Sequence, residues 1–213
     1  MLTRLVAPVG EPVSLIDAKA HLRVDHTSDD VLIGAQLASA RQTVEAHTGR
    51  ALLTQTWEWQ LDGAPTSNRV RLPVELLDPL GVTAPIAALT IPKAPLLAVL
   101  SVTYDDAAGV AQTMSPTSYV VQAPAGDTAP RGTLALAYGA AWPAARAARG
   151  SFRIRFTAGY GAAADVPAAL KAAILLLLGE LYESREASMQ GQAIQLSPAV
   201  DRLLSPYLLF WSA

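Results

Sequence analysis

The sequence has no cysteine, few aromatic residues and little charge, and each shortage excludes a class of protein. Without cysteine there is no disulfide framework, thiolate zinc site, iron–sulfur cluster or cysteine nucleophile. Charged residues make up 16% of the 213 residues and the formal net charge is -2, so no basic field attracts nucleic acid to the whole molecule. The hydrophobic content of 51% suffices for a sizeable core. We therefore expect one folded domain or two small ones.

Long hydrophobic runs are also missing. The longest, residues 172–178, is far shorter than the roughly 20 residues that cross a bilayer. Near the N-terminus, Pro8, Gly10 and Pro12 interrupt the chain before an apolar run of signal-peptide length develops. We expect neither export by a signal peptide nor a membrane partner.

Helical patterns occupy both ends of the chain. Ser14 and Asp17 form an approximate capping box before a short helix over residues 15–22. A polar stretch, residues 25–30, precedes a longer helix that ends at Gly49. Its apolar stripe consists of Ile33, Leu37, Ala40 and Val44. A third helix is expected after Asp165, its candidate N-cap, with Pro167 in the first turn. It carries a wide apolar face made of Leu170, Ile174, Leu177, Leu178 and Leu181.

Strand patterns fill the middle of the chain. In residues 54–61, Trp57, Trp59 and Leu61 alternate with polar residues, which is the period of a half-buried strand. Further strands are predicted at residues 69–72, 97–104, 119–122, 133–138 and 152–157. Turns are predicted at the Asp105–Gly109 acidic segment and at the Gly159–Gly161 segment.

These patterns predict an α+β fold. The N- and C-terminal helices form a small helical bundle, and an antiparallel β-sheet or sandwich is inserted between them. The expected segments are an N-terminal helical part (1–53), a β-rich insertion (54–164), a C-terminal helix (165–186) and an extended C-terminal arm (187–213).

The predicted arm ends in an unusually apolar group of residues. A short helix is expected near Val200, and an apolar terminus is costly to leave in water, so it is expected to dock either on its own subunit or on a neighbouring chain. The arm residues expected to make such a contact are Leu203, Leu204, Tyr207, Leu208, Leu209, Phe210 and Trp211.

No motif for catalysis, cofactor binding or metal binding is apparent. We therefore predict no catalytic, cofactor-binding or metal-ligating residues. His21, His26 and His47 with nearby aspartates lack the spacing of a metal site, so capping and solvation explain them better. No nucleophile elbow or acid–base pair is present, and the protein is expected not to be an enzyme.

Two groups of residues could form binding surfaces, and each also has a simpler structural explanation. Outward-facing Arg153 and Arg155, together with Arg146 and Arg149, form a possible basic contact face for phosphates or an acidic partner, although solvated arginines are commoner. The tryptophans at positions 57 and 59 are best explained as core residues, and a sugar-binding platform is the alternative.

The order of the segments resembles a known family. The phrases are SLIDAKAHLRVD, DDVLIGAQLASARQTVEAHTGRAL, QTWEWQLD, SVTYDDAAG, GSFRIRFTAGYG, VPAALKAAILLLLGELYESRE and VDRLLSPY. In this order, from Val13 to Tyr207, the chain resembles the head-tail connector (adaptor) proteins of long-tailed bacteriophages, prophages and gene transfer agents.

The resemblance implies a structural virion component at the head-tail interface, synthesised in the bacterial cytoplasm. It would form a ring with copies of itself, twelve-fold to match the portal protein, and extend the DNA channel. Residues 14–49 and 167–185 would build the ring, and residues 187–211 would reach the portal protein. A neck stopper or tail protein would bind below, and DNA would pass only transiently. The long strand-rich insertion is either a contact for the next neck protein or a solvent-facing decoration.

Three alternatives remain at this point. The first is a neck stopper or tail-completion protein, whose partner contacts lie mainly on the β portion. The second is a carbohydrate-binding β module that uses Trp57, Trp59 or Trp142. The third is an enzyme of unknown chemistry, for which no arrangement of acid, base and nucleophile is visible.

Overall fold

The computed structural model describes residues 1–65, 88–183 and 196–209. The chain divides into two compact units, which are described separately. A strand-rich unit contains residues 1–7, 55–125 and 130–158, and a helical unit contains residues 8–54, 126–129 and 159–213. The predicted strand over residues 69–72 lies outside the described residues.

The helical unit begins with two helices whose ends are set by local capping. Helix α1, Leu15–Leu22, starts at Ser14, whose Oγ accepts a hydrogen bond from the Asp17 amide at 3.1 Å. Helix α2, Asp30–Thr48, ends at Gly49 with φ +73°, a left-handed conformation that glycine adopts without strain. Both helices confirm the predicted ranges.

Helices α3, Ala168–Glu183, and α4, Pro198–Leu204, complete the helical unit, and a short 3₁₀ helix, η6, follows at Ser205–Tyr207. The predicted α2 stripe is buried throughout, and on α3 only Leu181 of the predicted face is partly exposed. Asp165 does not cap α3 as expected. Its Oδ2 accepts from the Ala162 amide at 2.9 Å and closes the 3₁₀ helix η4, Ala163–Asp165.

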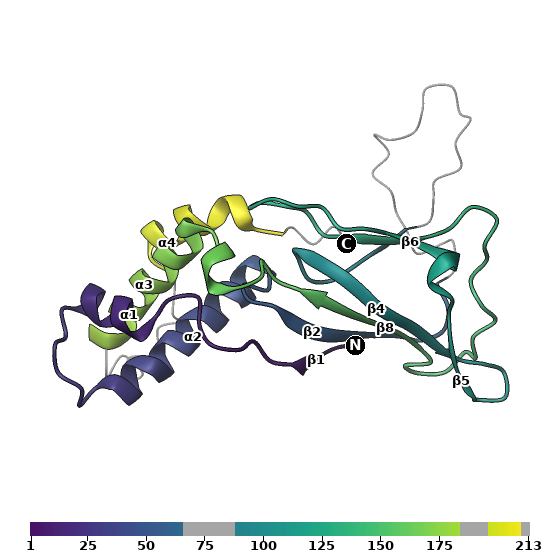
Figure 1. Ribbon diagram of the computed structural model, residues 1–213, viewed down its shortest axis with the longest axis horizontal. Helices are drawn as coiled ribbons and strands as arrows, with labels where there is room; N and C mark the ends of the chain where they lie inside the picture. The colour runs from purple at the N-terminus through teal and green to yellow at the C-terminus, as the bar shows by residue number, and fades with distance from the viewer. Residues whose placement is uncertain (66–87, 184–195, 210–213) are drawn as a thin grey trace, which may run out of the picture. The chain divides into compact units, whose positions relative to one another are not determined.

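The strand-rich unit contains two antiparallel sheets (Figure 1). The larger has the order β1-β2-β8-β4-β5 and the smaller the order β3-β7-β6. The strands of the larger sheet are β1 Leu2–Val6, β2 Gln55–Leu61, β4 Leu96–Asp105, β5 Ala111–Thr113 and β8 Phe152–Ala158. Those of the smaller are β3 Ala88–Thr90, β6 Tyr119–Gln122 and β7 Thr133–Leu136. The short 3₁₀ helix η3, Pro116–Ser118, precedes β6.

Strand β8 forms the centre of the larger sheet. Phe152, Ile154 and Phe156 alternate on one face and are fully buried, as the sequence predicted. Because β2 is directly opposite, Trp57 and Trp59 share that apolar face, but each is half-buried rather than fully buried. The fold is therefore α+β with inserted antiparallel sheets, and the predicted fold class is confirmed.

The unit boundaries differ from the expected segments at both ends and within the insertion. Residues 1–7, expected in the helical part, contribute β1 to the larger sheet. Residues 54, 126–129 and 159–164, expected in the β-rich insertion, group with the helices. The predicted turn at Asp105–Gly109 is confirmed. The Asp106 carboxylate accepts from the Val110 amide at 2.9 Å, from Gln112 Nε2 at 3.0 Å and from the Ala108 amide at 3.0 Å, and these bonds lower the pKa of Asp106.

Candidate assembly surfaces

The apolar C-terminal segment packs against its own helical unit. Helix α4 contacts α3, and Val200 and Leu204 are fully buried in the same core, with Tyr207 8% exposed (Figure 1). The prediction of an extended arm is thus corrected for residues 198–207. The sequence shows how apolar this segment is, but α3 supplies a large apolar face inside the same chain, and packing there removes the segment from water.

Of the seven predicted portal-contact residues, Leu204 and Tyr207 are core residues and Leu203 is partly buried against the core. Leu208 and Leu209 are half-buried, and the Leu209 amide donates to the Thr48 carbonyl at 3.2 Å. Phe210 and Trp211 lie outside the described residues. Among the described residues of this set, Leu204 and Tyr207 are therefore occupied by packing within their own chain.

A buried arginine holds this segment in place. Arg50, 1% exposed, follows the glycine that ends α2. Its Nε donates to the Tyr207 carbonyl at 2.7 Å, and its Nη1 donates to the Ala129 carbonyl at 2.8 Å. The guanidinium also lies 6.0 Å from the centre of the Tyr207 ring. One side chain thus joins the end of α2, residues 126–129 and η6.

Two tyrosines lie beside this arginine, which is itself 1% exposed. Burial raises the pKa of the Tyr160 phenol to about 12, and its hydroxyl donates to the Asp127 carbonyl at 2.6 Å. Burial also raises the pKa of Tyr207. Burial of the Arg50 guanidinium strengthens its hydrogen bonds and makes their loss costly. We call Arg50, Tyr160 and Tyr207 the arginine junction.

A second surface, on α1 and the first turn of α2, exposes apolar side chains. Ile16 is 80% exposed and Val31 is 87% exposed. The ion pair between Lys19 and Asp30, at 2.6 Å, joins these two helices. Contiguous exposed apolar surface marks contacts with other proteins, so Ile16 and Val31 are candidates for such a contact. We call Ile16 and Val31 the helical patch.

The four predicted basic residues are only partly brought together. Arg153 forms a two-point ion pair with Asp105, and its Nη1 also donates to the Gly150 carbonyl at 3.1 Å. Arg155 pairs with Glu58 at 3.0 Å, so both strand arginines are neutralised by carboxylates on neighbouring strands. Hydrogen bonding from Gln60, aided by Arg155, lowers the pKa of Glu58. This face is therefore a mixed-charge surface, and it is not a cationic one.

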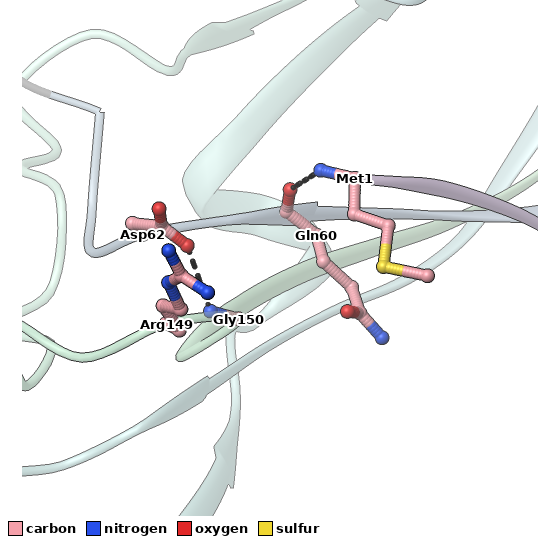
Figure 2. Close-up of a pocket in the computed structure, with 5 residues that line it drawn as sticks. All are labelled: Met1, Gln60, Asp62, Arg149 and Gly150. Carbon is pink, nitrogen blue, oxygen red and sulfur yellow. Dashed lines mark hydrogen bonds between the residues drawn. The ribbon is translucent and has the colours of Figure 1, made fainter.

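The two remaining arginines of that group are exposed. Arg149 borders a hollow of about 310 Å³ with Met1, Gln60, Asp62 and Gly150, as Figure 2 shows. The Gly150 amide donates to Asp62 Oδ1 at 3.0 Å, and the Met1 amino group donates to the Gln60 carbonyl at 2.8 Å. These polar groups serve to join loops at the end of the sheet. Arg146 contributes its backbone, since its carbonyl accepts from Ser151 Oγ at 2.6 Å.

The tryptophans proposed as a sugar platform are engaged within the chain. The ring of Trp57 lies 5.3 Å from Lys93 Nζ and 5.9 Å from the Arg4 guanidinium carbon. Trp142 contacts Phe152 edge to face, with 5.7 Å between the ring centres. Trp59 faces the sheet core. A flat, open aromatic platform is not formed by these three rings.

The described residues contain neither a metal-binding cluster nor a helix suited to a membrane. No group of three or more histidine and carboxylate side chains in this part of the chain is placed to hold a metal ion. His26 Nδ1 lies 2.7 Å from Ser28 Oγ, and His47 lies 3.6 Å from Asp201. Among the described helices, none has the length and apolarity needed to traverse a bilayer.

Sequence reasoning missed both the arginine junction and the helical patch. Ile16 and Val31 interrupt the polar sides of their helices, and that off-stripe position is the signal that reveals them. Arg50 carries no comparable signal, because arginine at the end of a helix is ordinarily solvated.

The fold and these surfaces define an α+β protein that exposes aliphatic residues of the kind used in protein–protein contacts. Residues 12–83, which include α1, α2 and β2, match the family described as phage gp6-like head-tail connector proteins. This match confirms the predicted resemblance to head-tail connectors. No curated protein sequence matches the chain.

Solved structures share this fold over nearly the whole chain. One is described as the neck of an empty gene transfer agent particle, with 23% identity and a TM-score of 0.71. The others are described as the virion of a native gene transfer agent particle (22%, TM-score 0.68) and the neck of a native particle (21%, TM-score 0.67). Each comparison covers 99% of this chain and 96% of the other. At these identities the likeness establishes the fold.

Proposed function

We propose that the protein is a structural head-tail connector. It forms a ring beneath the portal protein of a phage or gene transfer agent particle, extends the DNA channel and joins the capsid to the neck and tail. The observation that carries this proposal is the match of residues 12–83 to the head-tail connector family. That region contains both helices of the helical patch, so the family likeness and an exposed apolar surface coincide.

The ring is supported by the symmetry of the similar structures. Two of them are necks computed with six-fold and twelve-fold symmetry. A ring of identical chains needs contacts between unlike surfaces of neighbouring copies. The helical patch, with Ile16 and Val31, supplies one apolar surface for contacts with the portal or with another copy.

We retain the expected portal contact of the C-terminal end but assign it to fewer residues. Because Leu204 and Tyr207 are core residues of their own chain, we place the contact on residues 208–213, which follow the arginine junction. The apolar composition of this end supports a protein partner. The junction then fixes the point from which the end departs.

The proposed role is structural and involves no catalysis, and DNA passes through the ring without being held. Tight adhesion to phosphates requires unpaired cationic side chains, because these displace the counterions condensed on DNA and that release dominates the affinity. Here the strand arginines Arg153 and Arg155 are each paired with a carboxylate, and the net charge of the chain is -2. These features favour weak adhesion.

The test is binding to purified portal rings. We expect the full chain to co-sediment with portal rings, and the double variant Ile16→Ser/Val31→Ser to lose most of this binding. Both side chains are at least 80% exposed, so the variant is expected to keep the circular dichroism spectrum and unfolding midpoint of the parent.

The matched control is Val110→Ser/Val120→Ser, which replaces two residues that are 55% and 52% exposed in the strand-rich unit. It is expected to bind portal rings like the parent. Failure of the parent protein to bind portal rings, together with binding to an isolated tail component, would contradict a connector role. Equal binding by the helical-patch variant would remove the patch from the contact.

A further inference from the structure

The pairing register of the larger sheet shifts once in β1 and twice in β4, and the extra residue at each shift is an exposed leucine. In β1 the register with β2 shifts between Arg4 and Val6, so Leu5 is the extra residue. In β4 the register with β8 shifts twice, and the extra residues are Leu97 and Leu100. The exposed fractions are 45% for Leu5, 44% for Leu97 and 53% for Leu100.

The bulges explain why these leucines are outside the core. A bulge adds one residue to one strand and redirects a side chain that regular alternation would place elsewhere. A single exposed leucine is ordinary on a protein surface, but these three all lie at register shifts of one sheet. Leu96 and Val102 of the same strand are buried, so β4 contributes other side chains to the core.

The two edges differ from each other. Strand β1 is the last strand on one side, and its second edge has no strand partner among the described residues. On the other side, β5 pairs with β4 only from Thr103 to Asp105, with one more bond from the Met114 amide to the Val102 carbonyl. Residues 96–101 of β4 therefore have no strand on that side within the described chain.

We propose that β1 of one copy contacts the uncovered stretch of β4 in the next copy, through Leu5 on one side and Leu97 and Leu100 on the other. The inference rests on the ring proposed above and assigns one of its contacts. Because the two surfaces are unlike, the contact is head to tail, and it closes into a ring where the rotation between copies permits. The bulges interrupt the strand edges, so the contact uses side chains and avoids open-ended sheet extension.

A second copy is the occupant that the chemistry of both edges fits. Residues 96–102 read LLAVLSV and contain no charged side chain, so they offer nothing to DNA or to a charged peptide. In β1 the single charged side chain is Arg4, whose guanidinium lies over Trp57 of its own chain. Each edge thus presents aliphatic groups that match those of the other edge.

The absence of cysteine from the chain allows a direct test by disulfide trapping. Variants with a single substitution, Leu5→Cys, Leu97→Cys or Leu100→Cys, are assembled on portal rings, oxidised and run on non-reducing gels. We expect a mixture of the Leu5→Cys protein with one of the β4 variants to give a covalent dimer, because a disulfide requires Cα atoms within about 7 Å. The corresponding double-cysteine chain is expected to give a ladder of dimers, trimers and larger species.

The control is Leu5→Cys mixed with Val120→Cys, which places the second thiol on an exposed residue of the smaller sheet. It is expected to remain monomeric on the gel. Absence of a dimer from both β1–β4 mixtures overturns the inference, and so does a strong dimer from any single variant alone, which would indicate like-to-like pairing. Rings that still form on the portal without the disulfide would leave the connector function intact while excluding this contact.

Discussion

Replacement of Arg50 by methionine tests whether the arginine junction holds the C-terminal segment in place. Methionine keeps much of the apolar length but removes both donors, so the carbonyls of Tyr207 and Ala129 lose the hydrogen bonds that now satisfy them. Hydrogen bonds from a charged donor contribute about 1.5–3 kcal/mol each, so two contribute about 3–6 kcal/mol. Removal of a buried charge recovers part of its desolvation cost. We expect a net loss of about 2–4 kcal/mol.

The loss is expected to be local to α4 and η6. Amide hydrogen exchange measured by mass spectrometry should show residues 198–207 exchanging about 30- to 700-fold faster in Arg50→Met, which corresponds to that free-energy range. The conservative variant Arg50→Lys keeps the charge, but a single ammonium does not reproduce the two diverging N–H donors. It is therefore expected to lie between the parent and the methionine variant.

The matched control is Arg202→Met, which makes the same change at an exposed position on α4 itself. Exchange at residues 198–207 is expected to stay within about three-fold of the parent, since exposed substitutions have small effects. If Arg50→Met left the protection of α4 unchanged, the segment would be held by apolar packing alone. The arginine junction would then have no anchoring role.

Two further predictions concern a tight turn and a surface ion pair. A Cβ at Gly159, where φ is +139°, would lie 2.3 Å from the Leu53 carbonyl oxygen. Gly159→Ala should therefore lower the free energy of unfolding in urea by about 2–4 kcal/mol. An unchanged unfolding midpoint would show that the backbone shifts freely to make room. The pKa of Glu58 is lowered in the folded state, so its stabilising effect is present above the ordinary value of 4.5 and is lost as the pH falls through the lower folded value. Glu58→Gln should therefore lower the free energy of unfolding by less than about 1 kcal/mol at pH 7, because Arg155 is half-exposed. This difference in stability from the parent should vanish in acid. A difference that persisted in acid would assign the effect to packing.

The helices and most of the longer strands follow from the sequence because their signals are local. Ser14 and Gly49 mark the ends of α1 and α2 through capping bonds that involve neighbouring residues alone. In β8 the alternation of aromatic and charged residues matches a sheet with one buried face. Strand β1 has no such signal, since it is five residues long and obtains its hydrogen bonds from β2, more than fifty positions away.

The candidate surfaces depend on which chain covers an apolar residue, and composition does not encode that choice. The C-terminal segment and Ile16 are both apolar, yet Leu204 is buried by its own helices while Ile16 remains 80% exposed. The difference arises from tertiary packing. Helix α3 has apolar residues around most of its circumference, so it packs against α4 as well as against α1 and α2. Leu5 and Leu100 show the same limit for strands, since a bulge is visible only in the register of two paired strands. The residues that pack inside a chain therefore follow from sequence periodicity, whereas those left for other chains become identifiable only after the intrachain packing has been taken into account.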